Sequence, residues 1–126
     1  MTDLHRIERD EGVFPVADLD WDNTYYAALL DETPYAYLHL QTTPGSDRAM
    51  AHLTLLRFSR RVLREYRVDY AALTELLKQS GIKKIFWLKA YPVCQWEQLM
   101  HVLGFADPRD VQIDGKQYKM ICVEVY

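Results

Sequence analysis

Five arginines lie within eleven residues near the middle of the chain, and their side chains are suited to binding an anion. Only one acidic residue, Glu65, falls among them, so this stretch carries a net charge of +4 in a chain whose formal net charge is −3. Guanidinium groups bind phosphate through paired N–H donors. The stretch is therefore suited to binding a diphosphate or a 3′-phosphate. Its arginines are Arg57, Arg60, Arg61, Arg64 and Arg67.

The arginines are expected at the start of a long helix. Ser59 is a typical N-cap, and Gly81 suits the end of a helix over roughly residues 59–80. Arginines in the first turn oppose the positive helix dipole at about 0.3–1 kcal/mol each unless an anion is bound there. We therefore predict Arg60 and Arg61 as phosphate ligands, whereas the later arginines read as a solvated face. The apolar band consists of Val62, Leu63, Tyr66, Tyr70, Leu73 and Leu77.

Histidines are the side chains best suited to proton transfer near neutral pH. His52 lies on a predicted strand over 49–57, and His39 lies on its neighbour over 35–41. The alternative for each is a histidine that only makes hydrogen bonds within a sheet. His101 lies on a second predicted helix over 93–103 and is a further candidate. Cys94 is interpreted as a structural thiol, because no histidine–acid arrangement around it can be read from the sequence.

Alternating and helical patterns place these residues in a mixed sheet. Strands are predicted at 25–30, 35–41, 49–57 and 82–90, and Asp114–Gly115 predicts a C-terminal hairpin. The order is strand, strand, strand, long helix, strand, helix, hairpin. A strand–helix–strand unit requires a parallel crossover, while the hairpins are antiparallel. The fold class is therefore α/β, with a mixed, mostly antiparallel sheet.

The overall composition argues against several classes of protein. The chain has 126 residues, 49% of them apolar, which predicts one domain over 1–126. A pI near 5.8 argues against a basic nucleic-acid-binding protein. Two cysteines without a CxxC pair predict neither a disulfide framework nor a metal site, and no apolar run predicts a membrane span. We expect a cytoplasmic protein. The acidic stretch 18–22 is read as a solvated turn, or as an edge that attracts a basic ligand.

Two segments resemble the GNAT superfamily of acyl-CoA N-acetyltransferases. Ala51–Arg61 (AHLTLLRFSRR) is similar to the strand that enters the CoA-binding helix of that family. Gln95–Phe105 (QWEQLMHVLGF) is similar to the family's last helix, which ends in Leu-Gly-Phe before the final hairpin. The resemblance covers about residues 25–126. It implies a single GNAT-like domain, with a short variable region over 1–24 and a candidate acyl-CoA-binding half over 49–105.

The resemblance also implies an activity and a site. The expected reaction is transfer of acetyl from acetyl-CoA to a small-molecule amine or a protein amine. Backbone N–H groups near Leu55, Leu56 and Arg57 are expected to polarise the thioester, and Ser59, Arg60 and Arg61 to hold the phosphates. His52 and His101 are the expected catalytic residues.

The sequence also departs from the family pattern. No glycine occurs in Arg57–Leu63 (RFSRRVL), where the family has a glycine-containing phosphate loop, and Met100 stands where the family often has a tyrosine. These departures favour an alternative, a non-catalytic GNAT-fold protein that binds a protein partner. Tailed phages encode such proteins, and one of them would be a virion component or a host-directed factor. A third interpretation is an unrelated α/β interaction domain. The oligomeric state stays open.

Overall fold

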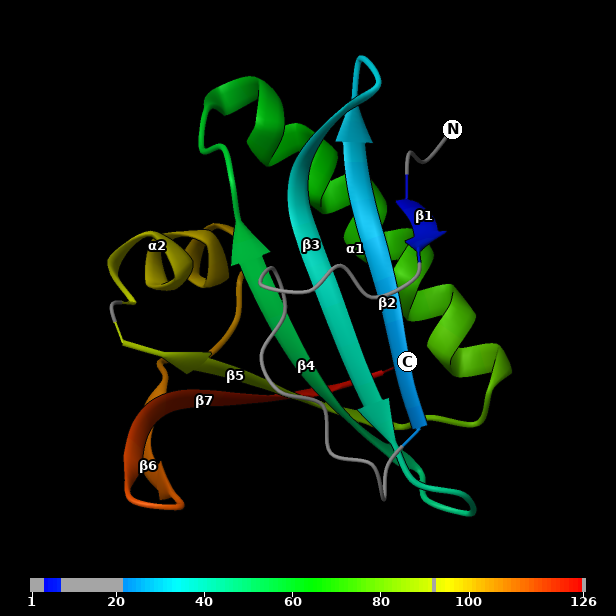
Figure 1. Cartoon of the computed structure of the whole chain (residues 1–126), viewed down its shortest axis with the longest axis vertical. Helices are drawn as coiled ribbons and strands as arrows, with labels where there is room; N and C mark the ends of the chain where they lie inside the picture. The colour runs from blue at the N-terminus through cyan, green and yellow to red at the C-terminus, as the bar shows by residue number, and fades with distance from the viewer. Residues whose placement is uncertain (1–3, 8–21, 92, 126) are drawn as a thin grey trace.

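The structure is a computed structural model that describes residues 4–7, 22–91 and 93–125. Within these residues, seven strands form one sheet in the order β1-β2-β3-β4-β5-β7-β6, accompanied by two helices (Figure 1). The elements are β1 Leu4–Ile7, β2 Asp22–Leu30, β3 Thr33–Thr42, β4 Arg48–Leu55, α1 Arg60–Gln79, β5 Lys84–Ala90, α2 Cys94–Val102, β6 Arg109–Ile113 and β7 Lys116–Glu124.

The sheet has the predicted mixed topology. Strands β4 and β5 pair in parallel and are joined through α1, whereas every other neighbouring pair is antiparallel. This confirms the α/β class, the crossover and the C-terminal hairpin. The predicted helices are each about one residue too long at both ends, and β4 ends at Leu55 rather than at residue 57. Thr33 and Pro34, predicted as turn residues, belong to β3, because a tight turn at Asp31 and Glu32 closes the hairpin with positive φ at both.

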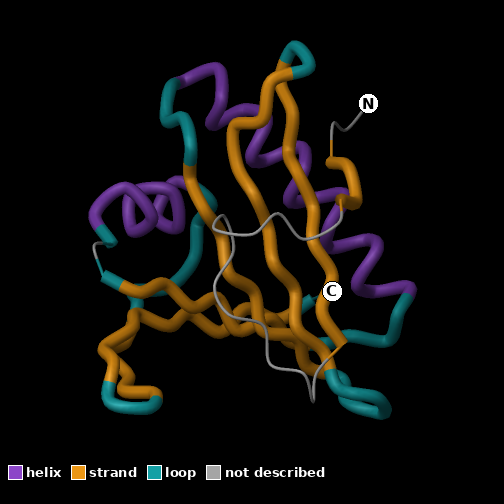
Figure 2. Tube along the Cα trace, in the orientation of Figure 1, coloured by secondary structure: helices purple, strands orange, loops and turns teal. Residues whose placement is uncertain are grey.

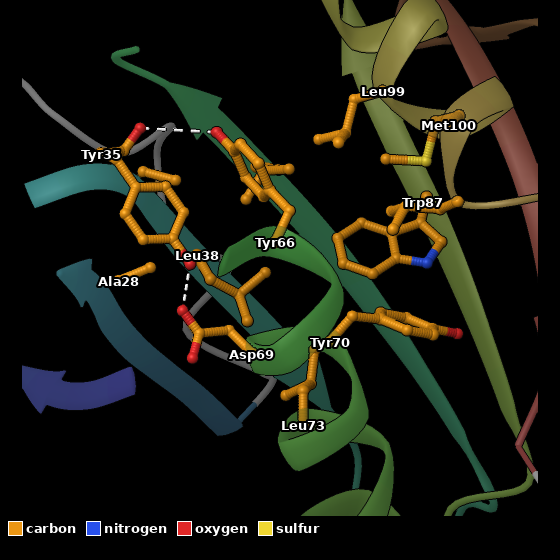
Figure 3. A pocket seen from close by; sticks show the side chains of 13 residues that line it. Ala28, Tyr35, Leu38, Tyr66, Asp69, Tyr70, Leu73, Trp87, Leu99 and Met100 are labelled. Atoms are coloured by element: carbon orange, nitrogen blue, oxygen red, sulfur yellow. Dashed lines mark hydrogen bonds between the residues drawn. The ribbon is translucent and has the colours of Figure 1, made fainter. Parts of the chain in front are cut away.

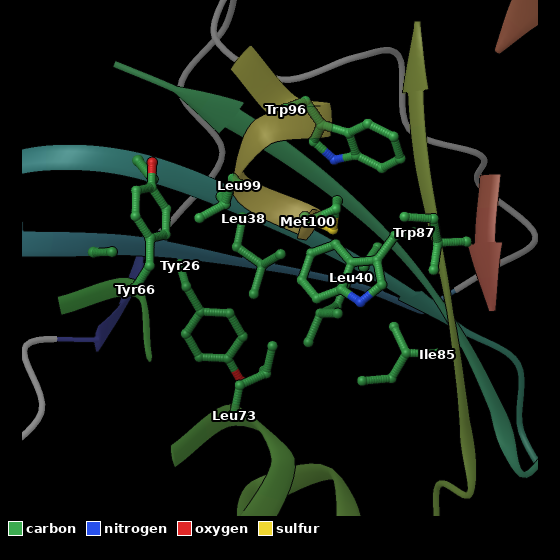
Figure 4. Close-up of a cluster of buried hydrophobic side chains, with 14 of the residues drawn as sticks. Tyr26, Leu38, Leu40, Tyr66, Leu73, Ile85, Trp87, Trp96, Leu99 and Met100 are labelled. Atoms are coloured by element: carbon green, nitrogen blue, oxygen red, sulfur yellow. The ribbon is translucent and has the colours of Figure 1, made fainter. Parts of the chain in front are cut away.

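Both helices share one hydrophobic core with the sheet. Figure 2 shows α1 running behind β2 and β3, with α2 beside the end of β4. Side chains from both helices meet the strands around Trp87, which is 3% exposed (Figure 4). Trp96, Leu99 and Met100 of α2 are buried there, as are Val62, Tyr66, Leu73 and Leu77 of α1. The spacing of Trp87, Trp96, Tyr66 and Tyr70 in the sequence also predicts core packing; the first three are buried in this core, and Tyr70 is partly buried against it.

Alternation along the strands gives the sheet a second, more polar face. On β3, Leu38 and Leu40 belong to the core cluster under the helices. His39 and Gln41 alternate with them in sequence, so their side chains point to the opposite face. His39 is nevertheless fully buried. His52 faces His39 across the β3–β4 ladder and therefore lies on this second face.

Candidate functional site

Strands β4 and β5 separate and form a fork. Their parallel pairing ends where His52 faces Leu88. Beyond this point β4 continues to Leu55 against β3, while β5 continues to Ala90 against β7. The backbone edges that would otherwise bond to each other are therefore released at the fork.

A cavity of about 330 Å³ occupies the fork. Thr54 and Leu55 line it from β4, Lys89 lines it from β5, and the first turn of α2 closes it with Cys94, Gln95 and Trp96. Trp96 is 1% exposed, and its Nε1–H has no hydrogen-bond partner among the described residues. Buried N–H donors in native structures nearly always have a partner. The indole N–H is itself closed off from solvent, so it belongs to the packed interior beside the cavity.

The backbone at the end of β4 offers one donor to this cavity. The N–H groups of Leu56 and Arg57 both donate to the carbonyl of Tyr35, at 2.9 and 3.2 Å. Because N–H groups alternate between the two edges of a strand, the N–H of Leu55 faces the β5 side, where pairing has ended. Of the three positions predicted to polarise a carbonyl, Leu55 alone has its N–H at the fork. The other two N–H groups hold the corner in place.

Helix α1 begins directly beyond this corner. Ser59 caps it as predicted, its Oγ accepting the Val62 N–H at 3.3 Å. The first turn contains no acidic residue. Arg60 and Arg61 are both exposed, and their backbone N–H groups belong to the open first turn, which favours an anion. This corner therefore has the positive charge that the sequence predicted.

The remaining arginines of the cluster lie around this turn. The Arg57 guanidinium reaches the carbonyls of Leu30 and Thr33 at 3.5 Å each. Arg67 reaches the carbonyl of Val102 at 3.4 Å, about two helical turns from the start of α1. Arg64 is exposed.

One carboxylate competes for this corner. Asp31, at the turn between β2 and β3, pairs with Arg61 at 2.8 Å, and both side chains are about two-thirds exposed. Asp31→Asn should free Arg61 and raise the affinity for inorganic pyrophosphate about 2- to 5-fold, the range expected for an exposed ion pair. Isothermal titration calorimetry measures this. Glu32→Gln, which removes the neighbouring charge and leaves the ion pair in place, is the control and should change the affinity less.

His52 stands at the base of the fork on the polar face. Its Nε2 lies 2.7 Å from Oε1 of Gln41. Burial lowers the pKa of His52 to about 4, so the imidazole is neutral at physiological pH. Thr54, two residues further along the same face of β4, lines the fork cavity. His52 itself is not among the residues that line this cavity, but its neutral imidazole, two residues from Thr54, is able to accept a proton.

The second predicted catalytic histidine lies elsewhere. His101 is exposed on α2 and lines a separate hollow of about 380 Å³ with Glu97, Phe105 and Asp107. Cys94 borders both hollows. The structure therefore does not bring His52 and His101 together. Met100, at the family's tyrosine position, is 1% exposed in the core.

A polar pair is buried under the sheet, away from the fork. The Tyr35 hydroxyl donates a hydrogen bond to the Asp69 carboxylate, and the Tyr66 hydroxyl donates to the Tyr35 carbonyl at 3.4 Å (Figure 3). These residues border an inner cavity of about 40 Å³. About 10–15 Å³ of such a cavity is needed to hold one water molecule, so this one has room for about three and is too small for a substrate. We interpret the pair as structural.

The remaining predictions concern the cysteines, metal binding, membrane spans and the acidic stretch 18–22. Both cysteines are free, exposed thiols. Among the described residues, no cluster of three or more potential metal ligands occurs. None of the helices that the structure describes is long and apolar enough to cross a membrane. The acidic stretch 18–22 falls outside the described residues except for Asp22.

Sequence reasoning missed several residues of this region. Gln41, Asn23 and Trp96 make or offer hydrogen bonds at the fork or behind it. Gln41 follows His39 by two positions on a predicted strand, so the two side chains are expected on the same face. That spacing could have indicated that Gln41 lies near the histidines. Asn23 was assigned to a turn, and no feature of the sequence links Trp96 to β4.

Comparison with known proteins gives fold-level matches. No protein-family model and no curated protein matches the sequence. The aminoglycoside acetyltransferase AAC(6')-Ib, solved with ribostamycin and coenzyme A, superposes with a TM-score of 0.61 at 16% identity, over 81% of this chain and 64% of that one. The GNAT domain of S. lividans PAT gives 0.61 at 12% identity, over 86% and 64%.

A third match is the ribosomal-protein-S5-alanine acetyltransferase from Vibrio fischeri, with a TM-score of 0.56 at 11% identity, over 82% of this chain and 62% of that one. The chain thus spans less than two thirds of the length of these three proteins. All three identities are low, so the likeness concerns the fold. The described residues of this chain adopt the fold of the GNAT acetyltransferases, as the sequence predicted.

Proposed function

We propose that the chain is an acyl-CoA-dependent N-acetyltransferase. The observation that carries the proposal is the fork: a cavity between two diverging strands, bordered by the Leu55 backbone, that lies beside a cationic helix start. AAC(6')-Ib has a similar fold and was solved with coenzyme A, which supports the same cofactor for this chain. The proposed contacts fall between residues 52 and 96, within the predicted acyl-CoA-binding half 49–105.

The residues at the fork fit an acyl-CoA. Arg60, Arg61 and the first-turn N–H groups would hold the diphosphate, with Ser59 fixing the turn. Guanidinium groups replace the glycine-containing loop of the family, so side chains rather than backbone would meet most phosphate oxygens. The acyl arm would lie in the fork cavity, where Leu55 offers its N–H donor. When bound, the cofactor supplies a thioester carbonyl and a thiolate leaving group.

The chain's own residues account for two steps. The Leu55 N–H would polarise the carbonyl oxygen as negative charge develops on it. His52 would accept the proton that the amine loses as its nitrogen bonds to the carbonyl carbon and the carbon–sulfur bond breaks. An imidazole with a low pKa can do this because the amine nitrogen becomes acidic only as that bond forms. His101 borders the separate hollow beside α2, and we assign it no step.

The acceptor would be a small-molecule amine or a protein amine. AAC(6')-Ib was solved with the aminoglycosides ribostamycin and kanamycin, and the Vibrio fischeri neighbour is named for acetylation of a ribosomal protein. Acceptors of both kinds are therefore compatible with the fold. Because His52 lies on the sheet face opposite α1, the amine would approach from that face.

Thermal stabilisation by acetyl-CoA tests cofactor binding. Acetyl-CoA at 100 times its dissociation constant should stabilise the wild type by about 2.7 kcal/mol. Arg60→Ala should weaken binding about 10-fold or more, because it removes a charge-assisted hydrogen bond. Arg67→Ala is the control, since Arg67 lies two turns further along α1 and should leave the affinity unchanged. No stabilisation of the wild type at millimolar acetyl-CoA would end the proposal.

A non-catalytic binding protein is the second candidate. The observation that favours it is the occupied backbone at the corner, where the Leu56 and Arg57 N–H groups already donate to Tyr35, together with the buried Met100 at the tyrosine position. Stabilisation by acetyl-CoA without transfer to any primary amine would favour this candidate. A role in a phage particle gains no support from the fold or the comparisons.

A further inference from the structure

Four polar side chains form a continuous hydrogen-bonded row behind the fork. His52 Nε2 lies 2.7 Å from Gln41 Oε1 on the neighbouring strand. Gln41 Nε2 donates to Asn23 Oδ1 at 3.4 Å, and His39 Nε2 lies 2.8 Å from the same oxygen. The row crosses β4, β3 and β2 on the face opposite the helices. It therefore links the candidate base to two strands that do not border the fork.

The donor and acceptor groups of the row fix the direction of each hydrogen bond. An amide oxygen only accepts, so Gln41 Oε1 requires a proton on His52 Nε2. The Asn23 oxygen likewise takes its hydrogens from Gln41 Nε2 and from His39 Nε2. With Nε2 protonated in the neutral ring, the lone pair of His52 sits on Nδ1. Gln41 thus selects which nitrogen of His52 can accept a proton.

Stacked rings hold the imidazole in its plane. The His39 ring stacks on His52 at a centroid distance of 5.2 Å and on Tyr25 at 4.7 Å. The titratable side chains that β3 presents on this face are His39 and Tyr37, and β2 adds Tyr25. Strand β5 opposes His52 with the uncharged Leu88. The ring of His52 is therefore fixed by a hydrogen bond at one nitrogen and by stacking on its face.

We propose that Gln41 is a positioning residue of the acyl-transfer site, which holds His52 with Nδ1 as the proton-accepting nitrogen and is itself oriented by Asn23. The proposal rests on the proposed function, in which His52 receives the amine proton. That proton goes to Nδ1 while Gln41 Oε1 keeps the Nε2–H, so Gln41 exchanges no proton. Asn23 and His39 act only through Gln41 and the ring stack.

The orientation is tested without any cofactor. Nitrogen-15 NMR of the histidine rings in the full chain should show His52 as the Nε2–H tautomer at pH 7. Gln41→Leu should mix the two tautomers of His52. Gln41→Glu should keep the Nε2–H tautomer and raise the pKa of His52 by about 1 unit or more, because a carboxylate then faces the ring. A wild-type His52 protonated on Nδ1, or a tautomer indifferent to Gln41→Leu, overturns the proposal.

The kinetic arm uses acetyl-CoA with a panel of primary amines. Gln41→Leu should lower kcat about 10- to 100-fold with the KM for acetyl-CoA unchanged, the usual effect of losing a partner that orients a functional side chain. Gln41→Glu should recover much of the rate and move the acid limb of kcat/KM to higher pH. An unchanged kcat in Gln41→Leu overturns the role of Gln41 while the proposed function stands. Absence of transfer by a wild type with the expected tautomer overturns the proposed function instead.

Discussion

Tyr35→Phe should lower the free energy of unfolding by about 2–3 kcal/mol. The Tyr35 hydroxyl donates to the Asp69 carboxylate, and the two side chains are 0% and 5% exposed. Removing one partner of a buried hydrogen bond to a charged group leaves the other incompletely solvated, which costs more than the bond itself contributes. Burial and the nearby carboxylate raise the pKa of Tyr35, so the hydroxyl keeps its proton at physiological pH. Urea denaturation measures the loss.

Two comparisons separate this effect from simple loss of a hydroxyl. Tyr66→Phe removes a neutral bond of 3.4 Å to the Tyr35 carbonyl and should cost less than about 1 kcal/mol. Tyr35→Phe combined with Asp69→Leu replaces both polar partners and should recover part of the stability. A Tyr35→Phe variant as stable as the wild type would show that the Asp69 carboxylate does not depend on this donor.

Tyr35→Phe should leave the candidate anion site at the start of α1 intact. The corner before α1 is tied to the Tyr35 carbonyl by the Leu56 and Arg57 N–H groups, and a backbone carbonyl is retained in phenylalanine. Pyrophosphate affinity of folded Tyr35→Phe should therefore match the wild type. This distinguishes the stability role of the Tyr35 side chain from the positioning role of its backbone.

The fold was largely predictable because its signals are local. Alternation over 35–41, the apolar band of α1 and the Asp114–Gly115 turn each specify an element from a few neighbouring residues. The crossover then follows from the order of the elements, since a strand, a helix and a strand pair in parallel. The aromatic residues Trp87 and Trp96 fell in the core for the same reason, as their positions match the buried faces.

Of the candidate site, only the cluster of charged side chains could be predicted from the sequence. The arginines at the start of α1 are visible as a cluster, whereas the donor at the fork depends on strand register. A shift of one residue would bring the Leu56 N–H rather than that of Leu55 to the β5 edge. The residues 43–47 between β3 and β4 set that register, and their composition indicates a loop without fixing its geometry. The bond between His52 and Gln41 depends on the same register.

The positions of the His101 and Asp31 side chains could not be predicted for a similar reason. His101 lies on a helix face whose rotation places it over a hollow away from the fork, although it is one residue from the buried Met100. Asp31 pairs with Arg61 across 30 positions of sequence, through a turn that brings the β2–β3 hairpin to the start of α1. Such contacts arise from tertiary packing and leave no pattern in the local sequence.

Acid should destabilise the protein through His52. Burial lowers the pKa of His52 in the folded state to about 4, from the ordinary histidine value of 6.5. Between these two values the unfolded chain binds the proton that the folded chain excludes, so stability falls as pH falls from 6.5 to 4. The full loss is about 3 kcal/mol, from 1.36 kcal/mol per pKa unit. Urea denaturation of wild type and His52→Gln across pH 4–7 measures it.

The difference between the two curves isolates His52, because carboxylates titrate alike in both proteins. His52→Gln keeps a side-chain donor for Gln41 and removes the ionisable ring, so its stability should fall less towards pH 4. His101→Gln, which removes an exposed imidazole on α2, should follow the wild type. Parallel curves for wild type and His52→Gln would show that His52 charges as readily when folded as when unfolded. The burial that makes the fold acid-sensitive is the same burial that keeps His52 unprotonated, and so able to accept a proton, at neutral pH.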